Sequence, residues 1–297
     1  MWISIRQLKP LSFLVGAFLL LAILPASTRA SDTSTATRDL DQIVESGQLI
    51  MLTFPHQESI FARTNLDQGV PMPRLGGYSD FVGIDVDLVK SFADSLGVEL
   101  KIRPVSEPRY SALIPDLLNG RGDLIASSLT ITEERQELVD FSRPYFEVYP
   151  VLVTRAGSDV STFEQLNDLV GVVTAGSSHE ERLNRMGIEP ATLLRVDFSI
   201  ETYATVLEGN ADYTLADSLS ARRFVDTEPG LEVAFRLEGR DDYGVAVRKS
   251  STKLLSALNG FLEGAHASGE IERFLAKHID GQGADVLSRG GVTRSSD

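Results

Sequence analysis

Apolar residues follow two alternating patterns between residues 40 and 280. Short apolar runs predict strands at 49–54, 99–105 and 123–126. Helical spacing predicts helices at 83–97 and 110–119, each ending at or before a glycine. Strands that alternate with helices predict an α/β fold with a largely parallel sheet covered by helices.

The same alternation starts again in the second half of the chain. Strands are predicted at 171–174, 192–196 and 212–217, and helices at 179–186, 200–208 and 218–225. Two extended strands, 148–154 and 244–248, flank this series, and two helices, 251–267 and 269–278, follow it. A chain of 297 residues is long enough for two lobes that each bury a core, and we expect two lobes.

The first 30 residues differ from the rest of the chain. Arg6 and Lys9 precede an apolar run at 11–24, and small residues follow up to Ala30. The run is shorter than the roughly 20 residues that a bilayer span needs, so it predicts a secretory signal peptide over 1–30. The chain has no cysteine, which excludes disulfides, thiolate chemistry and a lipid attached through cysteine.

The chain is acidic, with 42 Asp and Glu against 28 Lys and Arg and a net charge of −14. Because basic runs are absent, we expect no binding to nucleic acid or to anionic lipid. The four histidines, His56, His179, His266 and His278, lack paired metal-ligand spacing, so no metal or other cofactor is expected. The segment 281–297 has no apolar periodicity and predicts a flexible tail.

The stretch 123–145 holds the densest candidate chemistry. Its apolar start leads into hydroxyl residues, and Thr132 is predicted as the N-cap of a short helix in which Leu138 faces inward. Arg135 projects from the first turn of this helix. Backbone N–H groups, hydroxyls and a guanidinium at a helix N-terminus suit a small anion such as a carboxylate. Alternatively, the hydroxyls only cap the helix and Arg135 pairs with a neighbouring acid.

Five motifs then follow one another along the chain: GIDVDLVKSFADSLG, ALIPDLLNGRGDLIASSLTITEERQELVDFSRPY, GVVTAGSSHEERL, ADYTLADS and YGVAVRKSSTKLLSALNGF. In this order they resemble the bacterial extracellular solute-binding proteins of family 3, periplasmic receptors that deliver amino acids and related polar solutes to ABC importers. The resemblance covers nearly all of residues 45–280. GSSHEE and DYTLADS in particular resemble the N-terminal module of membrane-bound lytic transglycosylase F, although no lytic domain is expected in a sequence that stops at Asp297.

The resemblance implies the two-lobed periplasmic-binding-protein fold of type II, in which two crossing strands join the lobes and hinge closure encloses the ligand. Strands 148–154 and 244–248 would form the hinge. Lobe 1 would comprise 40–148 and 249–280, and lobe 2 would comprise 149–248. The residue pattern agrees, because both hydroxyl-rich turns follow strand ends at which open α/β sheets bind ligands.

The resemblance also implies which residues hold the carboxylate of an amino acid. Arg135 occupies the place of the arginine that clasps it, with two parallel donors that a lysine cannot offer. Ser128 and Thr130 match residues that bond the ligand through a hydroxyl or a backbone N–H, and Ser127 is adjacent. Ser178 of the second lobe matches the residue whose amide meets the same carboxylate. Both lobes would then share one anion, which favours closure.

Four further residues are matched to the rest of the ligand. Asp217 aligns with the carboxylate that receives the α-ammonium, or else serves as a helix N-cap. Tyr110 aligns with the platform for the ligand side chain, or else belongs to the core. Phe54 lies near the place where binders of cationic amino acids keep an acid, which argues against a lysine- or arginine-type ligand. His179 either touches the ligand or begins its helix.

These matches imply a monomeric, non-catalytic periplasmic receptor that captures a neutral or polar amino acid and delivers it to the membrane permease of an ABC importer. Two alternatives stay open. One is a sensor or regulatory module that binds a cell-wall peptide or an amino acid. The other is an enzyme similar to cyclohexadienyl dehydratase, which would need an acid or base in the cleft. Only Asp217, His179 and Tyr110 could serve there.

Overall fold

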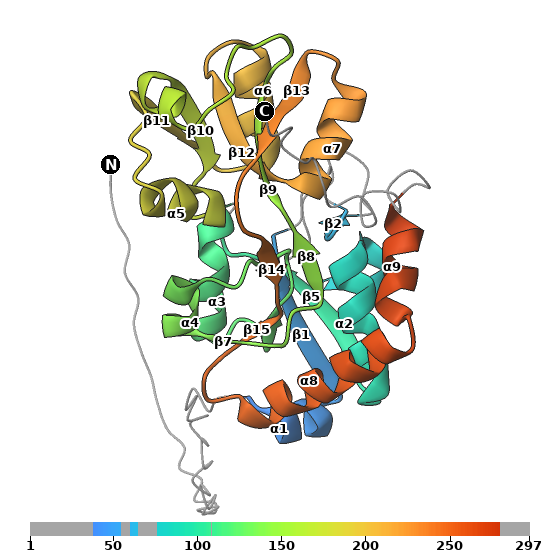
Figure 1. The fold of residues 1–297 in the computed structure, drawn as a ribbon. Helices are drawn as coiled ribbons and strands as arrows, with labels where there is room; N and C mark the ends of the chain where they lie inside the picture. The colour runs from blue at the N-terminus through green and yellow to red at the C-terminus, as the bar shows by residue number, and fades with distance from the viewer. Residues whose placement is uncertain (1–37, 55–59, 65–75, 108, 280–297) are drawn as a thin grey trace, which may run out of the picture. The chain divides into compact units, whose positions relative to one another are not determined.

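Two larger β-sheets, each packed against helices, and two two-stranded pairs lie in the described part of the chain (Figure 1). The structure is a computed structural model, and it describes residues 38–54, 60–64, 76–107 and 109–279. The predicted signal peptide, 1–30, and the predicted tail, 281–297, lie outside the described residues.

The first sheet has six strands in the order β3-β5-β1-β6-β15-β7. They are β3 (Gly76–Gly77), β5 (Glu99–Pro104), β1 (Gln48–Thr53), β6 (Leu124–Ile125), β15 (Ala246–Val247) and β7 (Asp140–Phe141). β1 runs parallel to β5 and β6, whereas β15 is antiparallel to β6 and β7. We call this sheet, with the helices packed on it, lobe 1. A separate antiparallel pair, β2 (Arg63–Thr64) and β4 (Phe81–Val82), precedes its second helix.

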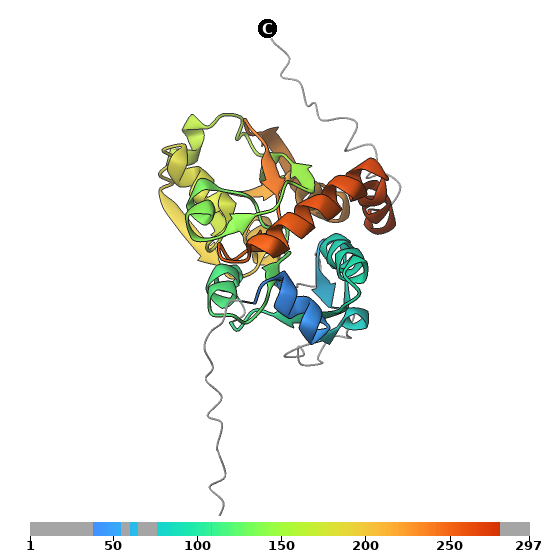
Figure 2. The ribbon, with the colours of Figure 1, turned by 90° about the horizontal axis from the view of Figure 1, so that it is seen from below.

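The helices of lobe 1 come from both ends of the described chain: α1 (Leu40–Ser46), α2 (Ile84–Ser95), α3 (Leu113–Leu118), α4 (Glu133–Leu138), α8 (Thr252–Ala267) and α9 (Glu270–His278). α1 lies beside α8, as Figure 2 shows from below. α2 starts after Gly83, where a Cβ atom would lie 2.1 Å from the carbonyl oxygen of Phe61, so only glycine fits. Of the helices in the described ranges, none is both long and apolar enough for a bilayer span.

The second sheet has five strands in the order β11-β10-β12-β9-β13. They are β11 (Thr192–Val196), β10 (Val170–Thr174), β12 (Tyr213–Asp217), β9 (Pro150–Arg155) and β13 (Leu231–Arg236). β10 runs parallel to β11 and β12, and β9 is antiparallel to β12 and β13. Together with α5 (Ser178–Arg185), α6 (Ser199–Leu207) and α7 (Ser218–Thr227), this sheet forms lobe 2.

Two short strands cross between the lobes. β8 (Phe146–Val148) and β14 (Asp241–Tyr243) pair antiparallel, with Phe146 opposite Tyr243. In Figure 1 this pair lies between the two sheets. The expected hinge strands, 148–154 and 244–248, fall mostly on β9 and β15, which belong to the sheets of lobe 2 and lobe 1. The crossing pair therefore lies slightly earlier in the sequence on both sides than expected.

Three local predictions differ from the structure. Leu138, expected to face inward, is 52% exposed, because the side chain that the short α4 buries is that of Arg135. The predicted helix 110–119 starts as a 3-10 turn at Tyr110–Ala112 and becomes α3 only afterwards. No strand is predicted where β13 and β14 lie. β14 has the sequence Asp-Asp-Tyr, which carries no apolar run from which a strand could be predicted.

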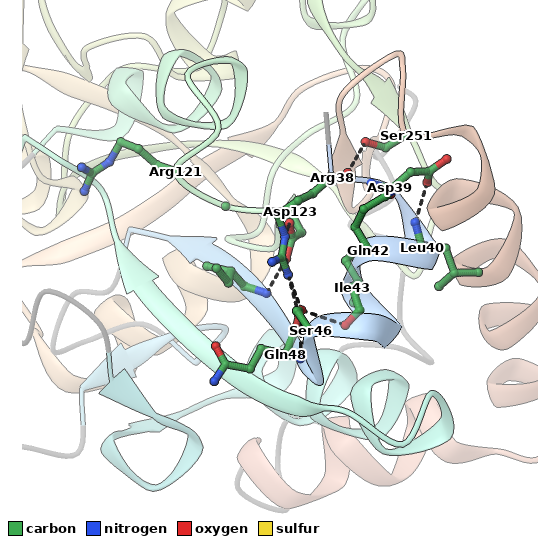
Figure 3. A network of polar contacts seen from close by, with 12 residues as sticks. Arg38, Asp39, Leu40, Gln42, Ile43, Ser46, Gln48, Arg121, Asp123 and Ser251 are labelled. Carbon is green, nitrogen blue, oxygen red and sulfur yellow. Dashed lines mark hydrogen bonds and ion pairs between the residues drawn. The ribbon is translucent and has the colours of Figure 1, made fainter. Parts of the chain in front are cut away.

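A partly buried ion pair fixes the start of the described chain to lobe 1. Asp123 is 1% exposed, and its carboxylate accepts hydrogen bonds from Nε of Arg38 at 2.8 Å and from the backbone N–H of Ile50 at 2.8 Å. Arg38 also donates to the carbonyl of Gln48 at 2.7 Å. Figure 3 shows these side chains together beside α1. Within the sequence Arg121-Gly122-Asp123, the aspartate thus stabilises lobe 1 through these bonds.

Candidate functional site

A cavity of ≈ 100 Å³ lies between lobe 1 and lobe 2, where β1, β6, β10 and β12 end. Half of its lining residues carry aliphatic hydroxyls: Ser127, Ser128, Thr130, Thr174, Ser177, Ser178, Ser199, Thr202 and Ser220. The others are Phe54, Phe61, Tyr110, Tyr203, Tyr243, Leu215, Ala216, His179 and Asp217. Within the described residues, the lining thus contains one carboxylate and no lysine or arginine. This composition suits a small polar ligand.

The turn after β6 supplies the lobe 1 side of the cavity. The hydroxyl of Ser127 accepts the backbone N–H of Phe54 at 3.0 Å, so this side chain is fixed against the end of β1. Tyr110 donates its hydroxyl to the carbonyls of Ser127 and Ser128 at 3.3 and 3.4 Å. Burial raises the pKa of Tyr110 to about 12, so its hydroxyl stays protonated and remains a donor to the turn.

The N-terminus of α5 supplies the facing side from lobe 2. Ser177 caps α5, because its hydroxyl accepts the N–H of Glu180. The two preceding N–H groups, those of Ser178 and His179, have no acceptor inside the helix, since they belong to its first turn. The hydroxyls of Ser178 and Thr130 lie 3.0 Å apart, so the two lobes touch here. A helix N-terminus carries partial positive charge and favours an anion.

His179 is the second residue of α5. Burial lowers its pKa, although Asp241 and Asp217 act in the opposite direction. Its Nδ1 atom is buried and makes no hydrogen bond to any residue that the structure describes.

Arg135 lies next to the cavity but is not part of its lining. Its guanidinium donates to the carbonyl of Thr130 at 2.8 Å and to the carbonyl of Gly176, in lobe 2, at 3.1 Å. Its Nε atom lies 3.6 Å from Glu181. Two of its N–H groups are therefore directed at carbonyl oxygens of the protein, and its role as the clasp for a carboxylate stays a prediction. The sequence alternative was pairing of Arg135 with Glu133, Glu134 or Asp140, whereas its acidic neighbour in the structure is Glu181 of lobe 2.

Asp217 combines the two roles considered for it. One carboxylate oxygen, Oδ1, accepts the N–H groups of Leu219 and Ser220 at 3.1 and 2.8 Å and so caps α7. The other oxygen, Oδ2, makes no hydrogen bond within the described ranges, and Asp217 lines the cavity. Capping therefore leaves half of the carboxylate available to a cation.

Aromatic rings close the remaining side of the cavity. Phe54 packs edge-to-face on Tyr110, with ring centroids 6.0 Å apart, and stacks on Phe198 of lobe 2 at 5.3 Å with an interplanar angle of 24°. Tyr203 stacks on Phe224 at 4.1 Å. Such rings offer an apolar surface to a ligand side chain, and the stack of Phe54 on Phe198 also joins the two lobes.

Eight of the nine residues expected at the site line this cavity: Phe54, Tyr110, Ser127, Ser128, Thr130, Ser178, His179 and Asp217. Arg135 is the exception. Several lining residues were not expected, including Ser199, Thr202 and Tyr203 on α6. The sequence signal for them is weak, because they belong to an ordinary amphipathic helix and only the fold turns that end of α6 toward the cleft.

The fold and the cavity define a two-lobed α/β binding protein with its ligand space between the lobes. The chain belongs to the bacterial extracellular solute-binding proteins, family 3, whose family model matches residues 70–281.

The chain is also similar to individual proteins in sequence and in structure. A probable histidine-binding protein of Neisseria gonorrhoeae is 29% identical over 73% of this chain and 81% of its own length. Membrane-bound lytic murein transglycosylase F of Pseudomonas fluorescens is 33% identical over 67% of this chain but only 42% of that protein. Among solved structures, a mutant of ArgBP from T. maritima matches with a TM-score of 0.70 and 32% identity, over 81% of this chain and 98% of that one. The predicted two-lobed fold is thus confirmed, whereas the roles of single site residues stay predictions.

Proposed function

We propose that this protein is an exported, non-catalytic receptor that captures a neutral or polar amino acid between its lobes and delivers it to the permease of an ABC importer. The observation that carries the proposal is the polarity of the cavity. The open oxygen of Asp217 offers a partner for an α-ammonium, and the N-terminus of α5 with the hydroxyls of Ser178 and Thr130 offers one for an α-carboxylate.

The same lining supports a ligand whose side chain carries no charge. Once Asp217 has met the ammonium, no second carboxylate and no cationic side chain remains among the described lining residues. A charged ligand side chain would then be buried without a partner, which is costly. The aromatic surface of Phe54 and Tyr110 instead accommodates apolar and neutral polar groups.

Arg135 supports the carboxylate end in this proposal. When the lobes separate, its guanidinium loses the carbonyl of Gly176, because that residue belongs to lobe 2. A ligand carboxylate makes a stronger, charge-assisted bond to a guanidinium than a neutral carbonyl does. We infer that an incoming amino acid competes with Gly176 for Arg135 and takes over its place.

Calorimetric titration of the purified protein with the twenty L-amino acids tests the proposal. We expect one or a few amino acids with uncharged side chains to bind. Asp217→Asn should weaken that binding by about 2 kcal/mol, because a charged hydrogen bond is lost, and should spare the corresponding acid that lacks the α-ammonium. Asp226→Asn, an exposed position on the same helix, is the matched control and should bind like wild type. Equal losses for both ligands in Asp217→Asn would contradict the assignment of the ammonium.

A sensor of cell-wall peptides is the second candidate, supported by the likeness to the transglycosylase over two thirds of this chain. Muropeptides belong in the same titration. Binding of a muropeptide in place of free amino acids would favour the sensor and would set aside the importer proposal.

A further inference from the structure

Asp85 is a buried carboxylate behind the cavity, and it is not among the lining residues. It lies in the first turn of α2 and is 0% exposed. Its Oδ2 atom accepts the backbone N–H of Ser128 at 2.6 Å, and its Oδ1 atom accepts the hydroxyl of Tyr145 at 2.5 Å. A carboxylate that only stabilised the helix N-terminus could do so from the solvent, without the cost of burial.

The residue that Asp85 holds has an unusual backbone. Ser128 has φ 45°, and it is the one residue other than glycine with positive φ in the ranges that the structure describes. The left-handed region is unfavourable for residues with a Cβ atom, so the surroundings must stabilise it. The hydroxyl of Ser128 donates to the carbonyl of Ser127 at 2.8 Å, so it is occupied within the turn. Asp85 therefore holds the N–H side of this peptide, while its carbonyl side, that of Ser127, also accepts the hydroxyl of Tyr110 at 3.3 Å.

That orientation matters for the cavity. Ser127, Ser128 and Thr130 all line it, and the hydroxyl of Thr130 meets Ser178 across the cleft. If the peptide of Ser128 turned over, these groups would move relative to lobe 2. Burial raises the pKa of Asp85 to about 7, while the bonds from Tyr145 and Ser128 act against this rise, so the protein maintains a costly group at this point.

We propose that Asp85 is a positioning residue for the ligand site, which holds Ser128 in the left-handed conformation and thereby presents the turn 127–130 to the ligand. This inference rests on the proposed function for the identity of the ligand, but the geometry of the turn can be tested without it.

The second partner of Asp85 extends this role to the crossing strands. Tyr145 is 2% exposed and directly precedes β8, and its backbone N–H donates to the carbonyl of Tyr243 at 3.0 Å. Tyr243 belongs to β14 and lines the cavity. One carboxylate therefore connects the binding turn with the start of the crossing pair.

The test combines Asp85→Ala with Ser128→Gly, because glycine adopts positive φ without help. Hydrogen exchange of the segment 127–130, measured on the whole protein by mass spectrometry, should accelerate about tenfold or more in Asp85→Ala. The dissociation constant for the amino acid that gives wild type its largest thermal shift should rise by about tenfold. Adding Ser128→Gly should restore affinity to within roughly threefold of wild type. Asp85→Asn keeps an acceptor for the N–H and should lose less affinity than Asp85→Ala.

Asp87→Asn is the matched control on the same helix. Asp87 is also buried but pairs with Lys277 and His278 at 2.7 Å, away from the cavity, so this variant should lose stability with unchanged exchange at 127–130 and unchanged affinity. Should Asp85→Ala not fold, Asp85→Val, which keeps most of the volume and has no acceptor, takes its place. Unchanged exchange at 127–130, or a loss of affinity that Ser128→Gly does not relieve, would overturn the proposal. If no amino acid binds wild type, the proposed function fails, and the exchange measurements still decide the role of Asp85.

Discussion

Among single residues, two aspartates close to the cavity show how surroundings decide what a carboxylate does. Asp217 divides its oxygens between the N-terminus of α7 and the cavity, so it can cap a helix and meet a ligand at the same time. Asp85 has both oxygens occupied by protein donors and cannot reach a ligand. The first is suited to exchange partners, and the second is suited to hold one conformation.

The raised pKa of Asp85 predicts a pH dependence of stability. The pKa of Asp85 is raised to about 7 in the folded protein, from 3.8 for an aspartate exposed to water, so between these values the folded state binds the extra proton. Its contribution is therefore fully present below pH 3.8 and is lost as the pH rises toward 7, at no more than about 1.4 kcal/mol per pH unit. The free energy of unfolding, measured with urea from pH 4.5 to 7.5, should lose this slope in Asp85→Asn.

Asp94→Asn, at an exposed position of the same helix, serves as the control and should keep the wild-type slope. A difference between wild type and Asp85→Asn that stays constant over the whole range would show that Asp85 is ionised throughout.

Residues of the site differ in how far the sequence could predict them. Thr130, Ser178 and Asp217 were predictable, because they stand in motifs at strand ends, where the fold itself places a ligand. The partners of Arg135 were not. Gly176 and Glu181 belong to the other lobe, and their approach depends on how the lobes meet, which no local pattern encodes.

Among helices and strands, boundaries were predictable wherever a cap defines them. Thr132 accepts the N–H of Arg135 and starts α4, and Gly47, with φ 68°, ends α1. The crossing pair lacked such signals. β14 is short and polar, and it is a strand because β8 lies opposite, so a contact distant in sequence overrides the weak local preference.

The ion pair that joins α1 to the sheet carries a prediction at this scale. Asp123→Asn removes the charge opposite Arg38 and Arg248, which lie 2.8 and 3.9 Å away. Because Asp123 is buried but Arg38 is partly exposed, we expect a loss of about 2 kcal/mol, below the range for a fully buried pair. Urea denaturation measures this loss. The exposed Asp94→Asn should leave the midpoint close to wild type, and a similar midpoint for Asp123→Asn would mean that the pair contributes little.

For the whole molecule, the close approach of the lobes is the decisive property. Gly176 has φ 72°, and a Cβ atom there would lie 2.8 Å from Cβ of Ser111 in lobe 1. Gly187, also in lobe 2, has φ 67° with nothing within 4 Å. The two glycines therefore share the same backbone requirement, and only one of them lies where the lobes touch.

This difference gives a matched pair of variants. Gly176→Ala and Gly187→Ala should each lose about 1 kcal/mol of stability through left-handed strain. Only Gly176→Ala should also hold the lobes apart, which lowers the closed fraction and raises the apparent dissociation constant for an amino acid by about tenfold. Calorimetry and urea denaturation together separate the two effects. Equal affinities in the two variants would argue that binding does not require the contact at Gly176.

The stack of Phe54 on Phe198 joins the lobes through protein atoms alone, and such a pair contributes about 1 kcal/mol beyond burial. This contact therefore stabilises the closed arrangement of the lobes without any contribution from a ligand. If it serves a permease, a shut molecule without cargo would occupy the transporter and deliver nothing. The strength of one aromatic pair would then set how often the ligand-free receptor binds the permease. A weaker pair would reduce this unproductive binding, but it would also lower the affinity of the receptor for its ligand.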